Sequence, residues 1–365
     1  MDAAWKCYDF VKRNRGKFLV AGTVTGGVIL AQRIYESRHR QLETPHVNHS
    51  QIAMARCQYI FDSNHRTCEA KLMELLPTVR NLLENYFNVE YLISMLRSDT
   101  LTQAEKVEIW EKLKIMSIAR VIAGAYAYGA LVHVMKCQMS IVSAGIYTTM
   151  QNVASAPRND GWLSYLPEVI SSQFKSSEPE LSAEQLSSHT SQEVFLRCIQ
   201  YFTSAGISQL FESVFKFTSE VVKDVELTRK LTSAELNEMF VRVILRIEQL
   251  DLAKFVVPGF GENADLNELL ERLVSSIESE KFKDNLRYSM DPFNETAMNC
   301  VVSVHGNTEA KSFAKLIPTI ADAFFTVVST DFDSPVQNCI CSPELYRLSK
   351  EVFNASVELG NANLA

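Results

Sequence analysis

The sequence predicts an all-α fold, namely a large elongated helical bundle with an N-terminal membrane-anchor helix. Apolar residues recur at helical spacing in one segment after another from about residue 49, and no strand-rich stretch interrupts them convincingly. Only 13 Gly and 10 Pro are present, and no proline falls between Pro77 and Pro157, which favours long helices over a sheet with tight turns. With 365 residues and 47% hydrophobic content, the chain can bury a substantial core.

The N-terminal region is predicted to attach the chain to a membrane. We divide it into a short basic segment (1–17), a membrane anchor (18–35) and a linker (36–48). The uncharged run 18–31 would span about 21 Å as a helix, so flanking basic side chains must help it to approach the roughly 30 Å hydrocarbon core. A cleaved signal peptide and a buried helix are the alternatives. The long segment before the run, and the lack of a convincing cleavage site after it, favour the anchor.

The remaining residues, 49–365, are predicted to form one helical-bundle domain. Its first helices are marked by an apolar row at helical spacing, which comprises Leu72, Leu75, Leu76, Val79, Leu82 and Leu83. Pro77 lies inside this row and predicts a kink or a restart of the helix. Further along, Thr102 and Glu105 have the spacing of a capping box, which predicts that the next helix starts there.

The next helix contains a long apolar run between Arg120 and Lys136, interrupted only by His133. A second transmembrane helix and a helix buried on every side of a bundle have the same composition. The run of about fifteen residues is short for a membrane span, which favours the buried helix. His133 is then expected to be a hydrogen-bonded core residue.

Two polar regions, 154–190 and 285–310, are predicted to be flexible loops. The first is rich in serine, proline and charged residues, which favours a surface connection. Helical patterns resume after each region, and a final helix is expected from about Pro343.

A tryptophan stands near the start of the helix that follows Thr102. At about 100° per residue, Leu113 lies on an apolar line, whereas Trp110 lies on a neighbouring stripe between Lys106 and Lys114. This stripe brackets the indole between two ammonium groups. The residues alone favour an ordinary core position for Trp110, and the alternative is an aromatic anchor for a partner.

Little in the sequence points to catalysis. Gly259, Gly261 and Ala264 fit G-x-G-x-x-A before a helix, with 255–257 as a short strand and Asp265 as a cap. No second strand that ends in an acidic residue follows, so a nucleotide-dependent enzyme is the least favoured interpretation. Eight scattered cysteines lack metal-ligand spacing, and a net charge of −7 does not favour nucleic acid. We expect no enzyme activity, cofactor, metal or nucleic-acid partner.

Four stretches together resemble one known family. They are GTVTGGV in the anchor, YIFDSNHRTC (59–68) with LPTVR (76–80), VEIWEKLKI (107–115) and AKLIP (314–318). In sequence and in order they resemble the peroxin-3 family of peroxisomal membrane biogenesis factors over nearly the full length. The two predicted loops match the family poorly.

The resemblance implies a docking receptor in the peroxisomal membrane, with the bulk of the chain facing the cytosol. The implied partner is peroxin-19, a soluble chaperone whose N-terminal amphipathic helix lies in a hydrophobic groove of the bundle. Peroxin-19 would bring membrane-protein cargo for insertion, and the anchor would contact peroxisomal membrane lipids. The residues that match the family's groove are Trp110, Lys106, Leu113 and Lys114, with Gln138 and Ser140 on the following helix. A membrane tether for organelle-inheritance or autophagy factors is the alternative.

Overall fold

A computed structural model describes five stretches of the chain, which are 49–98, 101–154, 183–261, 263–306 and 309–362. The chain divides into two compact units, Met1–Cys57 and Gln58–Ala365. In the first unit the described residues form the beginning of one helix, and the second unit contains the remaining elements.

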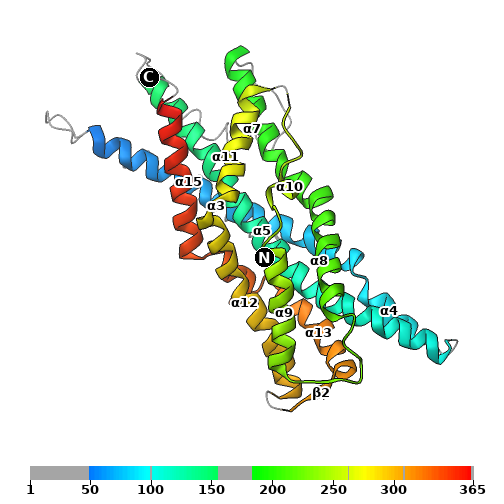
Figure 1. The fold of residues 1–365 in the computed structure, drawn as a ribbon. Helices are drawn as coiled ribbons and strands as arrows, with labels where there is room; N and C mark the ends of the chain where they lie inside the picture. The colour runs from blue at the N-terminus through cyan, green and yellow to red at the C-terminus, as the bar shows by residue number, and fades with distance from the viewer. Residues whose placement is uncertain (1–48, 99–100, 155–182, 262, 307–308, 363–365) are drawn as a thin grey trace, which may run out of the picture. The chain divides into compact units, whose positions relative to one another are not determined.

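Helices make up nearly all of the described residues, which confirms the predicted all-α fold (Figure 1). In chain order the helices are α3 (His49–Tyr86), α4 (Val89–Leu96), α5 (Gln103–Ala154), α7 (Ala183–Tyr201), the π-helical turn η2 (Phe202–Gly206), α8 (Ile207–Val222), α9 (Ser233–Ile247), α10 (Ala253–Val256), α11 (Ala264–Glu278), α12 (Glu280–His305), α13 (Phe313–Val327), α14 (Pro335–Ile340) and α15 (Pro343–Ala362). Two short strands, β1 (Lys230–Leu231) and β2 (Lys311–Ser312), pair antiparallel immediately before α9 and α13.

Helix α5 is the element against which most others in the second unit pack (Figure 1). Helices α4, α8, α12, α13 and α15 all contact it, and every residue from Ser117 to Ala144 is buried. By length and composition α5 could cross a membrane, but 89% of its apolar stretch is buried inside the protein. The predicted buried helix is therefore confirmed. His133 is a core residue as expected, with Nδ1 2.8 Å from the Gly129 carbonyl oxygen and Nε2 3.0 Å from Asn285 Oδ1.

Arg120 joins α5 to two neighbouring helices. Its Nη1 lies 2.6 and 2.8 Å from the two carboxylate oxygens of Glu90 on α4. Its Nη2 donates to the Ala321 carbonyl oxygen on α13 at 3.0 Å, and its Cζ lies 4.5 Å from the centre of the Phe324 ring. Because the arginine side chain is fully buried, these contacts fix the positions of α4 and α13 along the axis of α5.

The predicted start of α5 and the predicted apolar row of α3 agree with the structure. Thr102 and Glu105 form the predicted capping box before α5, since the Thr102 N–H donates to the Glu105 carboxylate at 2.7 Å and the Glu105 N–H donates to Thr102 Oγ1 at 3.4 Å. Helix α3 continues through Pro77 as a single element and does not restart. Four members of the apolar row are fully buried, namely Leu72, Leu76, Val79 and Leu83.

The predicted loop over 285–310 is wrong, because α12 runs through most of it and ends only at His305. Its buried residues keep helical spacing across the region, as Met290, Phe293, Ala297, Met298 and Val301. The polar residues between them lie on other faces of the helix, and Pro292 does not end it. Gly306, with a φ of 79°, supplies the left-handed residue that ends α12.

Other sequence predictions fall partly or wholly outside the described residues. Within the predicted loop 154–190, residue 154 still belongs to α5, and residues 183–190 are already helical in α7. The rest of that loop, like the basic segment 1–17, the membrane anchor 18–35 and the linker 36–48, lies outside them.

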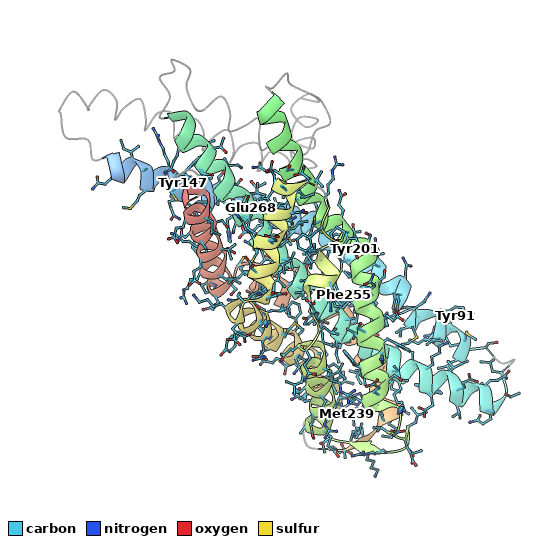
Figure 2. The ribbon with its side chains drawn as sticks, turned by 45° about the horizontal axis from the view of Figure 1, so that its top comes forward. Tyr91, Tyr147, Tyr201, Met239, Phe255 and Glu268 are labelled. Carbon is cyan, nitrogen blue, oxygen red and sulfur yellow. The ribbon has the colours of Figure 1, made fainter. Side chains whose placement is uncertain are left out.

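A close backbone contact fixes the junction between α7 and α8. At Gly206, the last residue of η2, an added Cβ would lie 1.8 Å from the carbonyl oxygen of Phe255 in α10 (Figure 2). Within the π turn, Thr203 Oγ1 donates to the Ile199 carbonyl oxygen of α7 at 2.9 Å. Only glycine therefore fits where η2 meets α10.

We expect Gly206→Ala to lower the free energy of unfolding by about 1–3 kcal/mol, because the methyl group forces η2 and α10 apart. Urea unfolding followed by circular dichroism measures the change. Gly261→Ala is the matched control, since no atom lies within 4 Å of the Cβ it would add. Equal stability of the two variants would contradict the steric argument.

Candidate partner-binding site

Trp110 is half-buried on the inward-facing side of α5. On the helix surface, Leu113 and Lys114 follow it by one turn and Ser117 by two turns, and these three side chains are all buried. Ile109, beside it in the sequence, is also buried. The indole therefore belongs to the face that packs against the bundle, although its cover is incomplete.

Lys114 points into the protein and does not line an exposed rim. Its ammonium group donates to the carbonyl oxygens of Val225 at 2.8 Å and Lys223 at 3.4 Å, and lies 2.5 Å from the Glu111 carboxylate. It also lies 6.0 Å from the centre of the Phe313 ring. The structure therefore does not present this charge to a partner. It places Lys114 as a buried support that holds the turn after α8 against α5.

Trp110 precedes the part of α5 that the turn after α8 contacts. Helix α8 ends at Val222, and the turn after it contacts α5 at Lys114. Trp110 lies one turn, or about 6 Å, closer to the N-terminus of α5. Helix α5 therefore extends toward its N-terminus past its contact with this turn, and half-buried Trp110 lies in the extension.

Two further apolar side chains, one on α5 and one on α4, are exposed. Lys106 is half-buried one turn before Trp110, and Val107 is 46% exposed. On α4, which packs against α5, Tyr91 is 59% exposed (Figure 2). Neither Val107 nor Tyr91 was predicted from the sequence, because the exposure of a side chain depends on how the helices pack.

The structure does not bring Gln138 and Ser140 together with Trp110. Both lie on α5 itself and not on a following helix, and Gln138 is about 42 Å from Trp110 along the helix axis. Both side chains are buried, with Gln138 donating to the Phe195 carbonyl oxygen and Ser140 Oγ donating to the Lys136 carbonyl oxygen at 2.8 Å. The grouping of these two residues with Trp110 in one groove is therefore corrected.

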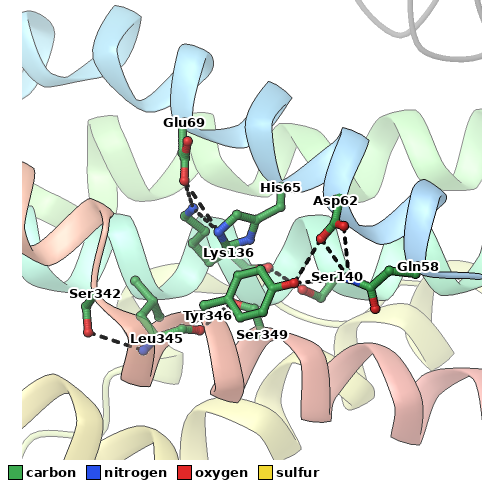
Figure 3. A network of polar contacts seen from close by, with 10 residues as sticks. All are labelled: Gln58, Asp62, His65, Glu69, Lys136, Ser140, Ser342, Leu345, Tyr346 and Ser349. Carbon is green, nitrogen blue, oxygen red and sulfur yellow. Dashed lines mark hydrogen bonds and ion pairs between the residues drawn. The ribbon is translucent and has the colours of Figure 1, made fainter. Parts of the chain in front are cut away.

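Near Ser140, α3, α5 and α15 share a network of polar contacts (Figure 3). The buried ammonium group of Lys136 lies 2.7 Å from His65 Nε2 and 2.8 Å from Glu69 Oε1. On the same side, the Tyr346 hydroxyl of α15 donates to Asp62 Oδ1 of α3 at 2.9 Å. Burial, and next the charge of Lys136, lower the pKa of His65 from 6.5 to about 4. His65 is therefore neutral at physiological pH and accepts a hydrogen bond from the ammonium group.

The glycine-rich segment does not have the structure of a dinucleotide site. Residues 253–256 form α10, so the strand predicted at 255–257 is wrong. The side chain of Asn263, and not that of Asp265, caps α11. The Asn267 amide accepts from the Gly261 N–H at 3.0 Å and donates to its carbonyl at 2.7 Å, which closes the segment as a turn between helices. Within the described ranges, no group of three or more His, Cys, Asp or Glu side chains is placed to hold a metal ion.

The fold and the surface around Trp110 together define a class of protein. It is an all-α protein in which an aromatic side chain near one end of the longest described helix is half-buried. Comparison with known families assigns it further. The sequence pattern of the Peroxin-3 family matches residues 97–356. The chain therefore belongs to the Peroxin-3 family, which confirms the resemblance found in the sequence.

Curated relatives agree with this assignment. Proteins named peroxisomal biogenesis factor 3 from mouse (Mus musculus), cattle (Bos taurus) and human (Homo sapiens) are each 28% identical to this chain over 242 residues. The aligned region covers 66% of this chain and 57% of each relative, so the match spans less than two thirds of the relatives' length.

The shifted pKa of His65 predicts a loss of stability in acid. Between about pH 6.5 and pH 4 the unfolded chain binds a proton at this histidine that the folded chain does not, so protonation favours unfolding. The stability that His65 contributes is fully present above pH 6.5. It falls by up to about 1.4 kcal/mol per pH unit as the pH decreases through this window.

Urea unfolding at a series of pH values from 7.5 to 4.5 measures this slope. We expect His65→Gln, which keeps an acceptor for Lys136 but cannot titrate, to have a shallower slope than the wild type. His133, whose pKa burial also lowers, contributes equally in both proteins. Identical slopes would mean that His65 does not titrate in the way its surroundings indicate.

Proposed function

We propose that this chain is a peroxisome biogenesis factor that acts as a docking receptor for the chaperone peroxin-19. In this proposal it resides in the peroxisomal membrane with its helical domain facing the cytosol. It binds the N-terminal amphipathic helix of peroxin-19 and supports insertion of the membrane proteins that the chaperone carries. Membership of the Peroxin-3 family and the names of the relatives support the biogenesis role.

The half-covered indole of Trp110 is the observation that supports the docking site. Tryptophan contributes strongly to interfaces because it buries a large apolar area and has few rotamers to lose. An apolar face of a partner helix would complete the cover that the protein leaves unfinished beyond the turn after α8. Buried Leu113 would support the indole from below, exposed Val107 would widen the contact, and Lys106 would lie at its edge.

Replacing Trp110 with alanine tests the docking site. We expect the affinity for a peptide from the N-terminus of peroxin-19 to fall by about 2–4 kcal/mol, which is about thirtyfold to a thousandfold. Isothermal titration of the purified fragment 49–365 with the peptide measures the affinity, and thermal unfolding checks the fold. Because the indole is only half-buried, the thermal transition should change little.

Leu113→Ala is the control for this experiment, because Leu113 is 1% exposed and one turn from Trp110. It should lower the thermal transition clearly, since a buried leucine truncated to alanine costs about 2–5 kcal/mol. The docking role of Trp110 would be rejected if its alanine variant bound the peptide as tightly as the wild type does. It would also be rejected if that variant lost as much stability as Leu113→Ala.

The two lysines that flank Trp110 are expected to act differently. Lys106→Glu should slow peptide association several-fold at low salt and leave the thermal transition unchanged, because a charge at the edge of an interface mainly affects encounter. Lys114→Met should lower stability instead, because the buried carbonyl groups of Lys223 and Val225 lose their donor. Stopped-flow association at two salt concentrations separates the effects. A Lys114→Met variant with normal stability and a slowed encounter would contradict the structural role of Lys114.

A further inference from the structure

The turn after α13 holds the most exposed of the large hydrophobic side chains in the described part of the chain. Phe332 is 92% exposed. The turn around it is well ordered by hydrogen bonds: Ser329 Oγ donates to Asp331 Oδ2 at 2.7 Å, and the Ser334 N–H donates to the Asp331 carbonyl oxygen at 3.1 Å. The phenyl ring is therefore held away from the protein by a defined backbone.

The residue next to this ring has an unusual backbone conformation. Asp333 has a φ of 64°, and among the described residues it is the only non-glycine residue with a positive φ. Aspartate tolerates the left-handed region better than most residues, but the conformation is less favourable for it than for glycine. Strained backbone that persists beside an exposed aromatic side chain is typical of residues with a role in recognition.

The turn that carries the exposed ring is joined to α3, and α3 is in turn joined to α13. Gln337 Nε2 lies 3.3 Å from both Met73 Sδ on α3 and the Thr330 carbonyl oxygen in the turn, so it joins the two elements. One turn further along α3, Pro77 is also exposed. After it comes Arg80, whose Cζ lies 5.4 Å from the centre of the Phe325 ring on α13.

We call the exposed apolar residues of this region the α3–α13 surface; they are Met73, Pro77, Phe325 and Phe332. From Met73 to Arg80 the surface follows α3 for about 10 Å. This length equals the spacing between residues i and i+7 of a partner helix, which lie on one face.

The charges around the α3–α13 surface are mainly negative. Asp331 and Asp333 flank Phe332 and are exposed, and exposed Asp322 lies one turn before Phe325. Arg80 does not offset them freely, because its guanidinium group bonds to Glu84 at 2.8 Å and stacks on Phe325. A positively charged partner is therefore favoured, and an anionic membrane surface is disfavoured.

We propose that the α3–α13 surface binds an amphipathic helix of a partner protein, with apolar residues on one face and lysines or arginines at its edges. Phe332 is the anchor that inserts between the apolar side chains of that helix, and the aspartates pair with its basic residues. The surface is separate from Trp110. Arg120, which contacts Phe325 at 5.5 Å, lies about 15 Å along α5 from Trp110.

The test uses the purified full chain in a non-ionic detergent and two fluorescent peptides of about 18 residues. One peptide carries leucines at i, i+3, i+4 and i+7 with lysines elsewhere, and the other carries glutamates in place of the lysines. Fluorescence anisotropy, with the signal from detergent alone subtracted, measures binding. We expect the lysine peptide to bind the wild type, and Phe332→Ser to weaken this binding about thirtyfold.

Phe260→Ser is the matched control, because Phe260 is another exposed phenylalanine (58%) in a turn between helices. It should bind the lysine peptide as the wild type does. Asp331→Asn combined with Asp333→Asn should weaken binding and remove most of its salt dependence.

Four results would overturn the proposal. Equal binding of the glutamate and lysine peptides would reject the chemistry of the partner. Unchanged binding by Phe332→Ser would reject the surface. A loss of binding in Trp110→Ala that equals the loss in Phe332→Ser would place the peptide at the other site. Finally, sedimentation could reveal a dimer that Phe332→Ser abolishes, in which case a second copy of this chain is the occupant.

Discussion

The organisation of the second unit depends on the burial of three positively charged side chains along α5. Lys114 binds the turn after α8, Arg120 binds α4 and α13, and Lys136 binds α3. A buried cation restricts the relative positions of two helices along their axes, because its partner must stay within hydrogen-bond distance. A buried cation that loses its partner is strongly destabilising. These three residues therefore define the register in which the surrounding helices pack on α5.

This register also sets the surroundings of Trp110, the residue proposed to bind a partner. Lys114 holds the turn after α8 against α5. Trp110 lies just beyond this contact. The indole is half-buried in the part of α5 that precedes this contact.

Local signals in the sequence predicted much of this structure. The capping box at Thr102, the apolar row of α3 and the buried run in α5 each depend on residues close together in the chain. The failures concern information that is not local. The sequence did not reveal that Lys114 points inward, because only α8 and the turn after it supply the carbonyl groups that hold it. It also did not reveal that Gln138 belongs to the same unbroken helix as Trp110. The polar residues and Pro292 of α12 obscured an apolar row that neighbouring helices bury.

The pairing of β1 with β2 has a consequence for the proposed docking site. Beyond the strand pair, the Phe313 and Ala314 N–H groups donate to the carbonyl oxygens of Arg229 and Leu227 at 2.9 and 3.0 Å. The segment that supplies the carbonyl groups for Lys114 is thus fastened at both ends, by α8 before it and by β2 and α13 after it. A loop fastened in this way is preorganised. An incoming helix that contacts this end of α5 does not have to order the loop first, so less of its binding energy is lost as conformational entropy.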